Sequence, residues 1–316
     1  MIISASRKTD IPAFFAEWFF NRIREGYVLS RNPMNAHQIS RIPLDPEVVD
    51  CIVFWTKNPG PMLQRLDELK DFRYYFQFTL TGYGKDLEAN LPDKRKVLIP
   101  AFRHLSDTVG PDRVIWRYDP IAFNETYTPE NHLSAYRQIA EALKGYTEKS
   151  VISFVDIYQT KNKTALDSLK ISEASDETMY SFASRLYDIA SANDMKIATC
   201  AEKIDLTPIG IEHNSCIDKD LIERICGGRI KVRKDQSQRA ECGCVASRDI
   251  GSYNTCLHGC RYCYANFKPD SVKATFARYD PSSPILCDSV DEAGGDRISD
   301  AKAVSLIDKQ IGMDLD

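Results

Sequence analysis

The sequence predicts an α/β protein: a partial, roughly six-stranded parallel β/α barrel followed by a cysteine-rich segment. Short apolar runs rich in Val, Ile, Phe and Tyr alternate with longer amphipathic stretches up to about residue 207. The alternation yields too few strands for a complete barrel of eight. No Gly-x-Gly-x-x-Gly loop follows any predicted strand, which disfavours a dinucleotide-binding fold. A doubly wound open sheet is the alternative.

The predicted strands are short and apolar, as strands buried on both faces should be. They are Ile2–Ser6, Cys51–Thr56, Tyr74–Leu80, Arg113–Tyr118, Val151–Ile157 and Lys196–Cys200. Two further extended runs, Tyr27–Ser30 and His37–Ile42, are expected to pair as a hairpin before the second strand of the sheet.

Amphipathic stretches between the strands predict helices that cover the sheet. They are Pro12–Glu25, Pro61–Leu69, Leu87–Leu105, Pro129–Leu143 and Asp176–Ser191. Three of these begin at a proline, which the first turn of a helix tolerates. Thr128 precedes Pro129 and is a suitable N-cap residue.

Composition indicates a soluble cytoplasmic protein. Hydrophobic residues make up 43% and charged residues 27%, and the net charge of −4 argues against wholesale binding of polyanions. The longest apolar runs, such as Cys51–Trp55, are too short to cross a membrane. Charge appears by Arg7, so we expect no signal peptide. We expect the barrel over residues 1–210 and, over residues 211–316, a segment that folds back on it.

Polar side chains recur where the predicted strands end. They are Lys8, Lys57, Thr81, Arg117, Asp119, Asp156, Tyr158 and Glu202, and Gly82 directly follows Thr81. Parallel α/β proteins carry their chemistry at the carboxyl ends of strands, and buried charges are costly unless they are paired or used. We therefore expect a site for a zwitterionic or phosphorylated ligand. The alternative is that these side chains pair with one another and cap the sheet.

The strongest chemical signal is the spacing of Cys256, Cys260 and Cys263. Five of the ten cysteines lie between positions 242 and 263, and a reducing cytoplasm favours metal binding over disulfides for such a group. A Cys-x-x-x-Cys-x-x-Cys run could hold three irons of a [4Fe-4S] cluster and leave the fourth open to a ligand. Gly259 lets the loop turn tightly. A zinc knuckle that includes His258 is the alternative.

This cysteine run, with Tyr262 before its last member, resembles the signature of the radical S-adenosylmethionine superfamily. The resemblance implies an α/β barrel and a [4Fe-4S] cluster whose open iron binds S-adenosylmethionine. It also implies one-electron cleavage of that cofactor to a 5′-deoxyadenosyl radical, with an electron donor such as flavodoxin or ferredoxin. In the superfamily the three cysteines usually follow the first strand, whereas here they follow the sheet and Arg7–Asp10 occupies the first loop.

A late triplet resembles the DUF1848 family, a bacterial family of unknown function whose C-terminal cysteines look like the radical-enzyme cluster. The matching segments are Ser4–Pro12, Trp55–Pro59, Arg117–Pro120 and Asp249–Tyr264. Under this hypothesis the candidate catalytic residues are Lys57, Arg117, Asp119 and Tyr158. The candidate cofactor-binding residues are Lys8, Thr81, Gly82, Asp156 and Glu202.

Four other cysteines, Cys200, Cys216, Cys242 and Cys244, are candidates for a second site that binds zinc or another iron–sulfur cluster. The basic segment Arg224–Arg239 is expected to be a solvated face, with a nucleic-acid contact as the alternative. Two rival functions stay open: an iron–sulfur redox or sensor protein without S-adenosylmethionine chemistry, and a zinc-stabilised nucleic-acid-binding or repair module.

Overall fold

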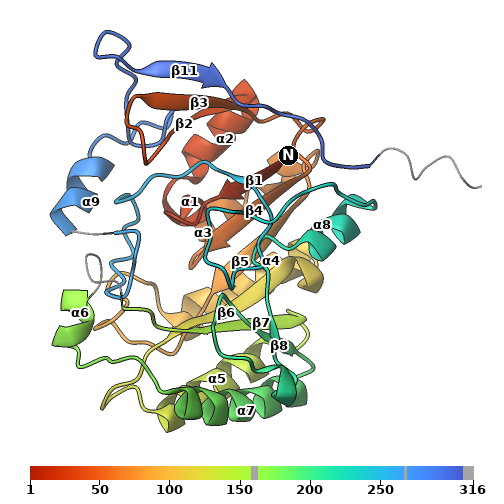
Figure 1. The fold of residues 1–316 in the computed structure, drawn as a ribbon, viewed down its shortest axis with the longest axis vertical. Coiled ribbons are helices and arrows are strands. Elements are labelled where there is room, and N and C mark those ends of the chain that lie inside the picture. Colours follow the sequence, from red (N-terminus) through yellow and green to blue (C-terminus); the bar gives the residue numbers. More distant parts are fainter. Residues whose placement is uncertain (158–162, 267–268, 309–316) are drawn as a thin grey trace, which may run out of the picture.

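The computed structural model describes residues 1–157, 163–266 and 269–308. Within them, eight parallel strands form the main sheet (Figure 1). They are β1 (Ile2–Ala5), β4 (Cys51–Thr56), β5 (Tyr74–Thr79), β6 (Val114–Ile121), β7 (Lys149–Phe154), β8 (Lys196–Thr199), β9 (Glu212–His213) and β10 (Arg248–Asp249). Their order is β10-β1-β4-β5-β6-β7-β8-β9. The sequence prediction of a parallel α/β sheet is confirmed, and the predicted strands occupy its centre.

The two strands at the edges of this sheet, β9 and β10, have two residues each and were not predicted. Such short strands have too few residues to show an apolar pattern. No ladder joins β9 to β10 within the described chain, so the sheet is open there. The description of this sheet as a partial barrel therefore stays a prediction.

A smaller sheet contains the predicted hairpin. Strands β2 (Tyr27–Arg31) and β3 (Gln38–Pro43) pair antiparallel, and β11 (Arg297–Asp300) adds to β3 in parallel. The hairpin is confirmed. Its third strand comes from the far end of the chain and carries no periodic signal of its own.

Helices follow the predicted amphipathic stretches, with differences in where some of them begin or break. They are α1 (Ile11–Phe14), α2 (Ala16–Glu25), α3 (Gly60–Leu63), α4 (Ile99–Val109), α5 (Pro129–Leu143), α6 (Lys163–Ser168), α7 (Asp176–Ala192), α8 (Lys219–Cys226) and α9 (Pro269–Phe276). Shorter helical turns are η1 (Leu66–Leu69), η2 (Lys94–Leu98), η3 (Pro111–Arg113) and η4 (Thr207–Ile209). The predicted first helix breaks at Phe15, and the helix predicted from Leu87 begins only at Lys94.

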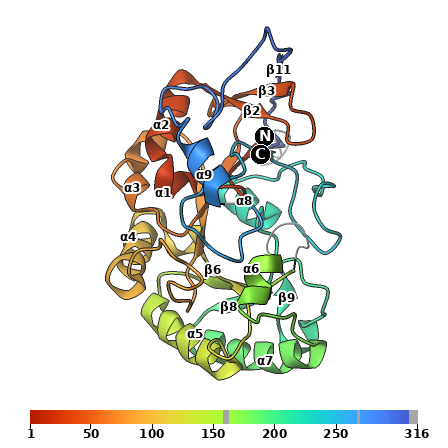
Figure 2. The same cartoon turned by 90° about the vertical axis from the view of Figure 1, so that its left-hand side faces the viewer.

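The two faces of the main sheet are covered differently. Alternate strand residues such as Phe54 and Phe76 pack against helices α1 to α5 and α7. The opposite residues, among them Val53 and Tyr75, pack against α8 and the cysteine-bearing chain around it. Figure 2 shows α1, α3, α4 and α5 along its left-hand side and α8 on the other side of the sheet. Buried parallel strands require this cover on both faces.

The described part of residues 211–316 returns to the strands at several places. Strand β10 pairs with β1, and β11 pairs with β3. The amino group of Met1 donates to the carbonyl of Val304 at 2.7 Å and binds the Asp50 carboxylate. A division at residue 210 stays a prediction, as does a cytoplasmic location. None of the helices in the described ranges combines the length and apolar character of a membrane span.

The stacked aromatic rings under the helices give a stability test. Phe76 is fully buried, and its ring centroid lies 4.8 Å from that of Phe54. Phe76→Ala is expected to lower the free energy of unfolding by about 3–5 kcal/mol, because it removes apolar contacts and leaves a cavity. Urea denaturation measures the change. The control Met34→Ala, at a side chain that is 93% exposed, should shift the free energy by less than about 0.5 kcal/mol.

Candidate functional site

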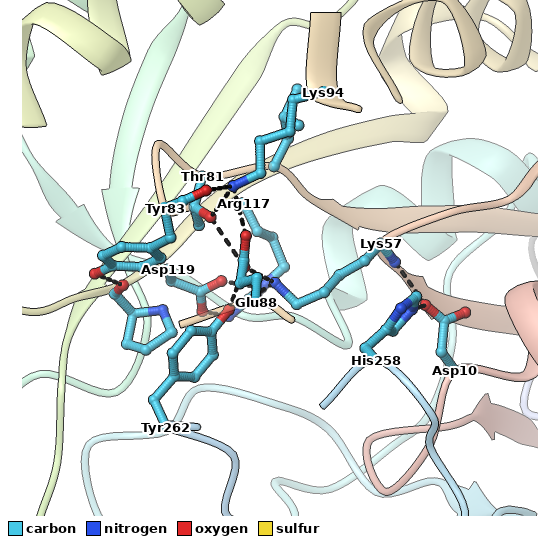
Figure 3. Close-up of polar contacts among 12 residues, drawn as sticks. Asp10, Lys57, Thr81, Tyr83, Glu88, Lys94, Arg117, Asp119, His258 and Tyr262 are labelled. Carbon is cyan, nitrogen blue, oxygen red and sulfur yellow. Dashed lines mark hydrogen bonds and ion pairs between the residues drawn. The ribbon is translucent and has the colours of Figure 1, made fainter. Parts of the chain in front are cut away.

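A buried carboxylate, Glu88, organises the carboxyl edge of the main sheet (Figure 3). Its side chain is 1% exposed and binds the ammonium groups of Lys57 and Lys94 at 2.8 and 2.5 Å. It also accepts hydrogen bonds from Thr81 Oγ1 at 3.0 Å and from the Tyr262 hydroxyl at 2.5 Å. A buried charge requires such partners, so Glu88 fixes the positions of side chains from four separate segments.

These contacts keep both Glu88 and Lys57 charged. Burial raises the pKa of Glu88, but the two ammonium groups outweigh burial and lower it to about 2. Burial lowers the pKa of Lys57, but the charges of Glu88 and Cys260 outweigh it and raise the pKa above its ordinary value. A permanent cation therefore lies beside the cysteine loop.

A second buried group lies next to the first. The Asp10 carboxylate accepts a hydrogen bond from the backbone N–H of Lys57 at 2.7 Å and lies 2.7 Å from His258 Nε2. His258 is 3% exposed, and its Nδ1 atom has no partner within the described chain. Asp10 also caps α1 by accepting from the backbone N–H of Ala13. This group joins the end of β1, the end of β4 and the cysteine loop.

The loop that carries Cys256, Cys260 and Cys263 is held by the chain that follows β5. The backbone N–H of Asn90 donates to the carbonyl of His258 at 3.1 Å, and the N–H of Arg261 donates to the carbonyl of Leu87 at 2.9 Å. Gly259 has φ +68°, and an added Cβ would lie 3.1 Å from the side chain of Asn90. Only glycine adopts this turn against so close a neighbour without strain.

The three thiols of the loop lie close enough to act on one another. Burial raises the pKa of Cys256, and the charges of Asp10, Cys260 and Cys263 raise it further. Burial raises the pKa of Cys260 to about 12 although Lys57 opposes the shift. No disulfide joins the three thiols to one another in the described chain. The structure therefore brings the predicted triplet together beside Lys57.

Arg117 lies with the other group of cysteines. Its Nη1 atom is 2.7 Å from Cys216 Sγ, and its guanidinium also binds Asp119. Cys200 Sγ lies 3.3 Å from Cys216 Sγ. The Cys244 thiol influences the pKa values of both Cys216 and Cys242, so it lies near both. The structure thus brings all four of the remaining predicted ligands together, on the face of the sheet that α8 covers.

The predicted cofactor-binding residues do not form one group. Lys8 Nζ lies 3.5 Å from an oxygen of Asp249, and Asp156 binds Arg239 at 2.6 Å. Glu202 accepts from the backbone N–H of Phe154 at 2.8 Å, and burial raises its pKa to about 7.

The last two predicted site residues are Gly82 and Tyr158. Gly82 is a packing position, since an added Cβ would lie 2.5 Å from the Cβ of Ala135 on α5. Tyr158 lies outside the described residues.

Sequence reasoning did not select Glu88, Lys94 or Asp10. Glu88 falls in a stretch whose apolar spacing predicts a helix, and a glutamate in such a helix is ordinarily expected on the solvated face. Lys94 Nζ also contacts Thr81 at 3.4 Å. Of the missed residues only Asp10 carried a sequence signal, because it precedes a proline-containing first helical turn as an N-cap residue does.

The basic segment Arg224–Arg239 is partly paired with acidic residues. Arg239 binds Asp156, and Lys231 binds Asp308 at 2.9 Å.

The donor groups at this edge differ in how well they suit a metal. In the ranges that the structure describes, no three His, Cys, Asp or Glu side chains are grouped so that they could hold an ion as they stand. The donor chemistry of the triplet nevertheless suits an iron–sulfur cluster: three thiols, a glycine turn and a backbone N–H of Ala265 that donates to Cys263 Sγ at 3.3 Å. Thiolate sulfurs in such clusters accept hydrogen bonds of this kind.

The Glu88 network predicts an acid-dependent loss of stability. Glu88→Gln is expected to lower the free energy of unfolding by about 3 kcal/mol near pH 7, because two buried ammonium groups lose their partner. Since the pKa of Glu88 lies below its ordinary value, the carboxylate contributes fully above about pH 4.5 and its contribution disappears as the pH falls towards 2. Urea denaturation of wild type and variant from pH 7 to pH 3 measures the difference.

The matched control is Glu125→Gln, which removes an exposed carboxylate paired with Lys170. It should change stability by less than about 0.5 kcal/mol at every pH. A Glu88→Gln difference that stays constant between pH 7 and pH 3 would contradict the assignment of the charged network.

Comparisons with known proteins bear on the family. No curated protein matches this sequence. A solved structure described as a "putative alpha-L-fucosidase from Bacteroides thetaiotaomicron" is 13% identical over 58% of this chain and 73% of that chain, with a TM-score of 0.27, which is too low to support an argument. The family model for a domain of unknown function, DUF1848, matches residues 2–265. The match spans both the sheet and the cysteine triplet, so the protein belongs to the DUF1848 family.

Proposed function

We propose that this protein is a radical S-adenosylmethionine-like enzyme whose cluster is held by Cys256, Cys260 and Cys263. The observation that carries the proposal is the meeting of these thiols with the Lys57–Glu88 pair at the carboxyl edge of the sheet. When bound, a [4Fe-4S] cluster with one open iron supplies the electron for reductive cleavage of S-adenosylmethionine. A small electron-transfer protein such as flavodoxin or ferredoxin would provide that electron.

The charges around the triplet support this role. Lys57 is kept protonated by Glu88, so that one cation always faces Cys260. The Tyr262 hydroxyl lies 2.8 Å from Lys57 Nζ and directs this ammonium group towards the loop. A ligand carboxylate at this edge would share the Lys57 ammonium with Glu88. The amino acid part of S-adenosylmethionine carries such a carboxylate.

Aromatic rings cover part of the loop, whose three cysteines are half-buried. Tyr262 is 8% exposed and packs against Tyr83, with 5.7 Å between ring centroids. Phe14 covers His258, with 4.6 Å between centroids. Excluding water strengthens the local electrostatic interactions and limits side reactions. These residues bind, orient and shield, which is the part that a protein plays around a reactive cofactor.

A second candidate is favoured by His258. Its Nε2 atom is engaged by Asp10 while its buried Nδ1 atom has no partner within the described chain. A histidine whose other nitrogen binds a carboxylate is the common arrangement at zinc sites. The alternative is therefore a zinc-stabilised module in which Cys256, Cys260, Cys263 and His258 hold one ion. An iron–sulfur carrier without S-adenosylmethionine chemistry is the third possibility.

Anaerobic reconstitution tests the proposal. Protein purified without air and treated with iron and sulfide should turn brown and contain about four irons and four sulfides per chain. With dithionite and S-adenosylmethionine it should release 5′-deoxyadenosine, measured by liquid chromatography. Cys260→Ala should lower that product at least tenfold, because one iron loses its ligand.

Cys287→Ala is the control, because Cys287 is buried and stands outside both cysteine groups. It should leave the product within twofold of wild type. A brown protein that releases no 5′-deoxyadenosine would identify an electron carrier. A colourless protein whose zinc is lost in His258→Ala would identify the zinc module.

A further inference from the structure

Four thiols from distant parts of the chain converge on the face of the sheet opposite α1 to α5. Cys200 directly follows β8, Cys216 follows β9, and Cys242 and Cys244 lie in the loop before β10. We call these residues the four-thiol group. Cys200 Sγ lies 3.3 Å from Cys216 Sγ, and the Cys244 thiol influences the pKa values of both Cys216 and Cys242. No disulfide links any of them.

The group is buried within an apolar cluster rather than placed at the surface. Cys216 is 5% exposed and Cys244 is 2% exposed, among side chains that include Val53 and Ile217. Free thiols are often buried singly as small apolar groups. Four gathered in one buried cluster are different, because they bring together the complete donor set of a structural metal site.

Hydrogen-bond donors point at the sulfurs. Arg117 Nη1 lies 2.7 Å from Cys216 Sγ, and the backbone N–H of Ile217 donates to Cys244 Sγ at 3.4 Å. The amide of Asn214 lies 3.7 Å from Cys216 Sγ, and this side chain is 4% exposed. Neutral thiols are weak acceptors and do not need a buried guanidinium. Metal-bound thiolates carry negative charge that donors of this kind stabilise.

The backbone around Cys216 is fixed just as firmly. Its carbonyl accepts hydrogen bonds from the Tyr75 hydroxyl at 2.6 Å and from Gln77 Nε2 at 2.9 Å. Both donors stand on β5 and are almost completely buried. Residues that orient a ligand in this way are the second layer that metal sites require.

We infer that the four-thiol group binds one zinc ion in a closed tetrahedral site. Zn–S bonds of about 2.3 Å place tetrahedral sulfurs about 3.8 Å apart, close to the 3.3 Å between Cys200 and Cys216. A four-iron cluster would hold its ligands much farther apart. Within the described residues the sulfurs do not surround an ion as they stand, but a change of one cysteine rotamer moves its sulfur by about 3 Å. Rotation and a small expansion therefore suffice to surround an ion.

Such an ion would fasten the returning chain to the sheet. It would join the end of β8 to residues 214–217 and to the loop that leads into β10. The cysteine triplet begins seven residues after β10, so the ion would also fix the start of the chain that leads to the triplet. This inference does not depend on the radical chemistry proposed above, because the two cysteine groups share no ligand.

Metal analysis of the full chain tests the inference. Wild type and a triplet variant, with Ala at positions 256, 260 and 263, are purified without air and assayed for zinc and iron. Both proteins should contain about one zinc per chain, and X-ray absorption at the zinc edge should show four sulfur neighbours at about 2.3 Å. Iron should appear only in wild type if the proposed function holds, and its absence there leaves the zinc result unaffected.

Variants of the four-thiol group supply the second measurement. Cys242→Ser combined with Cys244→Ser should lower the zinc content at least tenfold, whereas Cys226→Ser, a half-buried thiol outside the group, should leave it unchanged. If the double variant does not fold, absorption on wild type and on the triplet variant decides the matter.

The inference is overturned by a triplet variant without zinc, by zinc with nitrogen or oxygen neighbours in that variant, or by iron with sulfide that persists there. A disulfide between Cys200 and Cys216 in the anaerobic protein, detected by mass spectrometry, would also overturn it.

Discussion

The position of every group at the carboxyl edge depends on the need to neutralise Glu88. Its carboxylate is 1% exposed and would be costly to bury without partners. It therefore takes an ammonium from the end of β4, a second from η2, a hydroxyl from the end of β5 and another from the cysteine loop. Four segments that are distant in the sequence share one acceptor. Loss of this acceptor would release all of them together.

Part of this architecture was predictable because its signals are local. Helix α5 begins at Pro129 and ends at Leu143, as its proline, its threonine cap and its apolar spacing indicate. The hairpin of β2 and β3 was equally predictable from two extended runs in the sequence. The grouping of Cys200 and Cys216 with the Cys-x-Cys pair followed from donor type alone, and the structure brings these four residues together.

The remainder depends on contacts that no local pattern encodes. Residues 87–93 have helical spacing, yet they lie against the cysteine loop and the helix starts only at Lys94, after the Asp93 cap. Tertiary hydrogen bonds to His258 and Arg261 outweigh helix propensity there. The partner of Arg117 was equally unpredictable: its guanidinium binds Asp119 and lies 2.7 Å from Cys216 Sγ, a residue 99 positions away in the sequence.

The two cysteine groups are electrostatically connected although they lie on different parts of the sheet. Cys260 acts on Lys57, and the charge of Asp119 also acts on Lys57. Asp119 in turn binds Arg117, which donates to Cys216. Acids and cations alternate along this path, so each cation lies between a carboxylate and a thiol. Although burial opposes them, the carboxylates raise the pKa values of both Lys57 and Arg117 and so keep a positive charge beside each cysteine group.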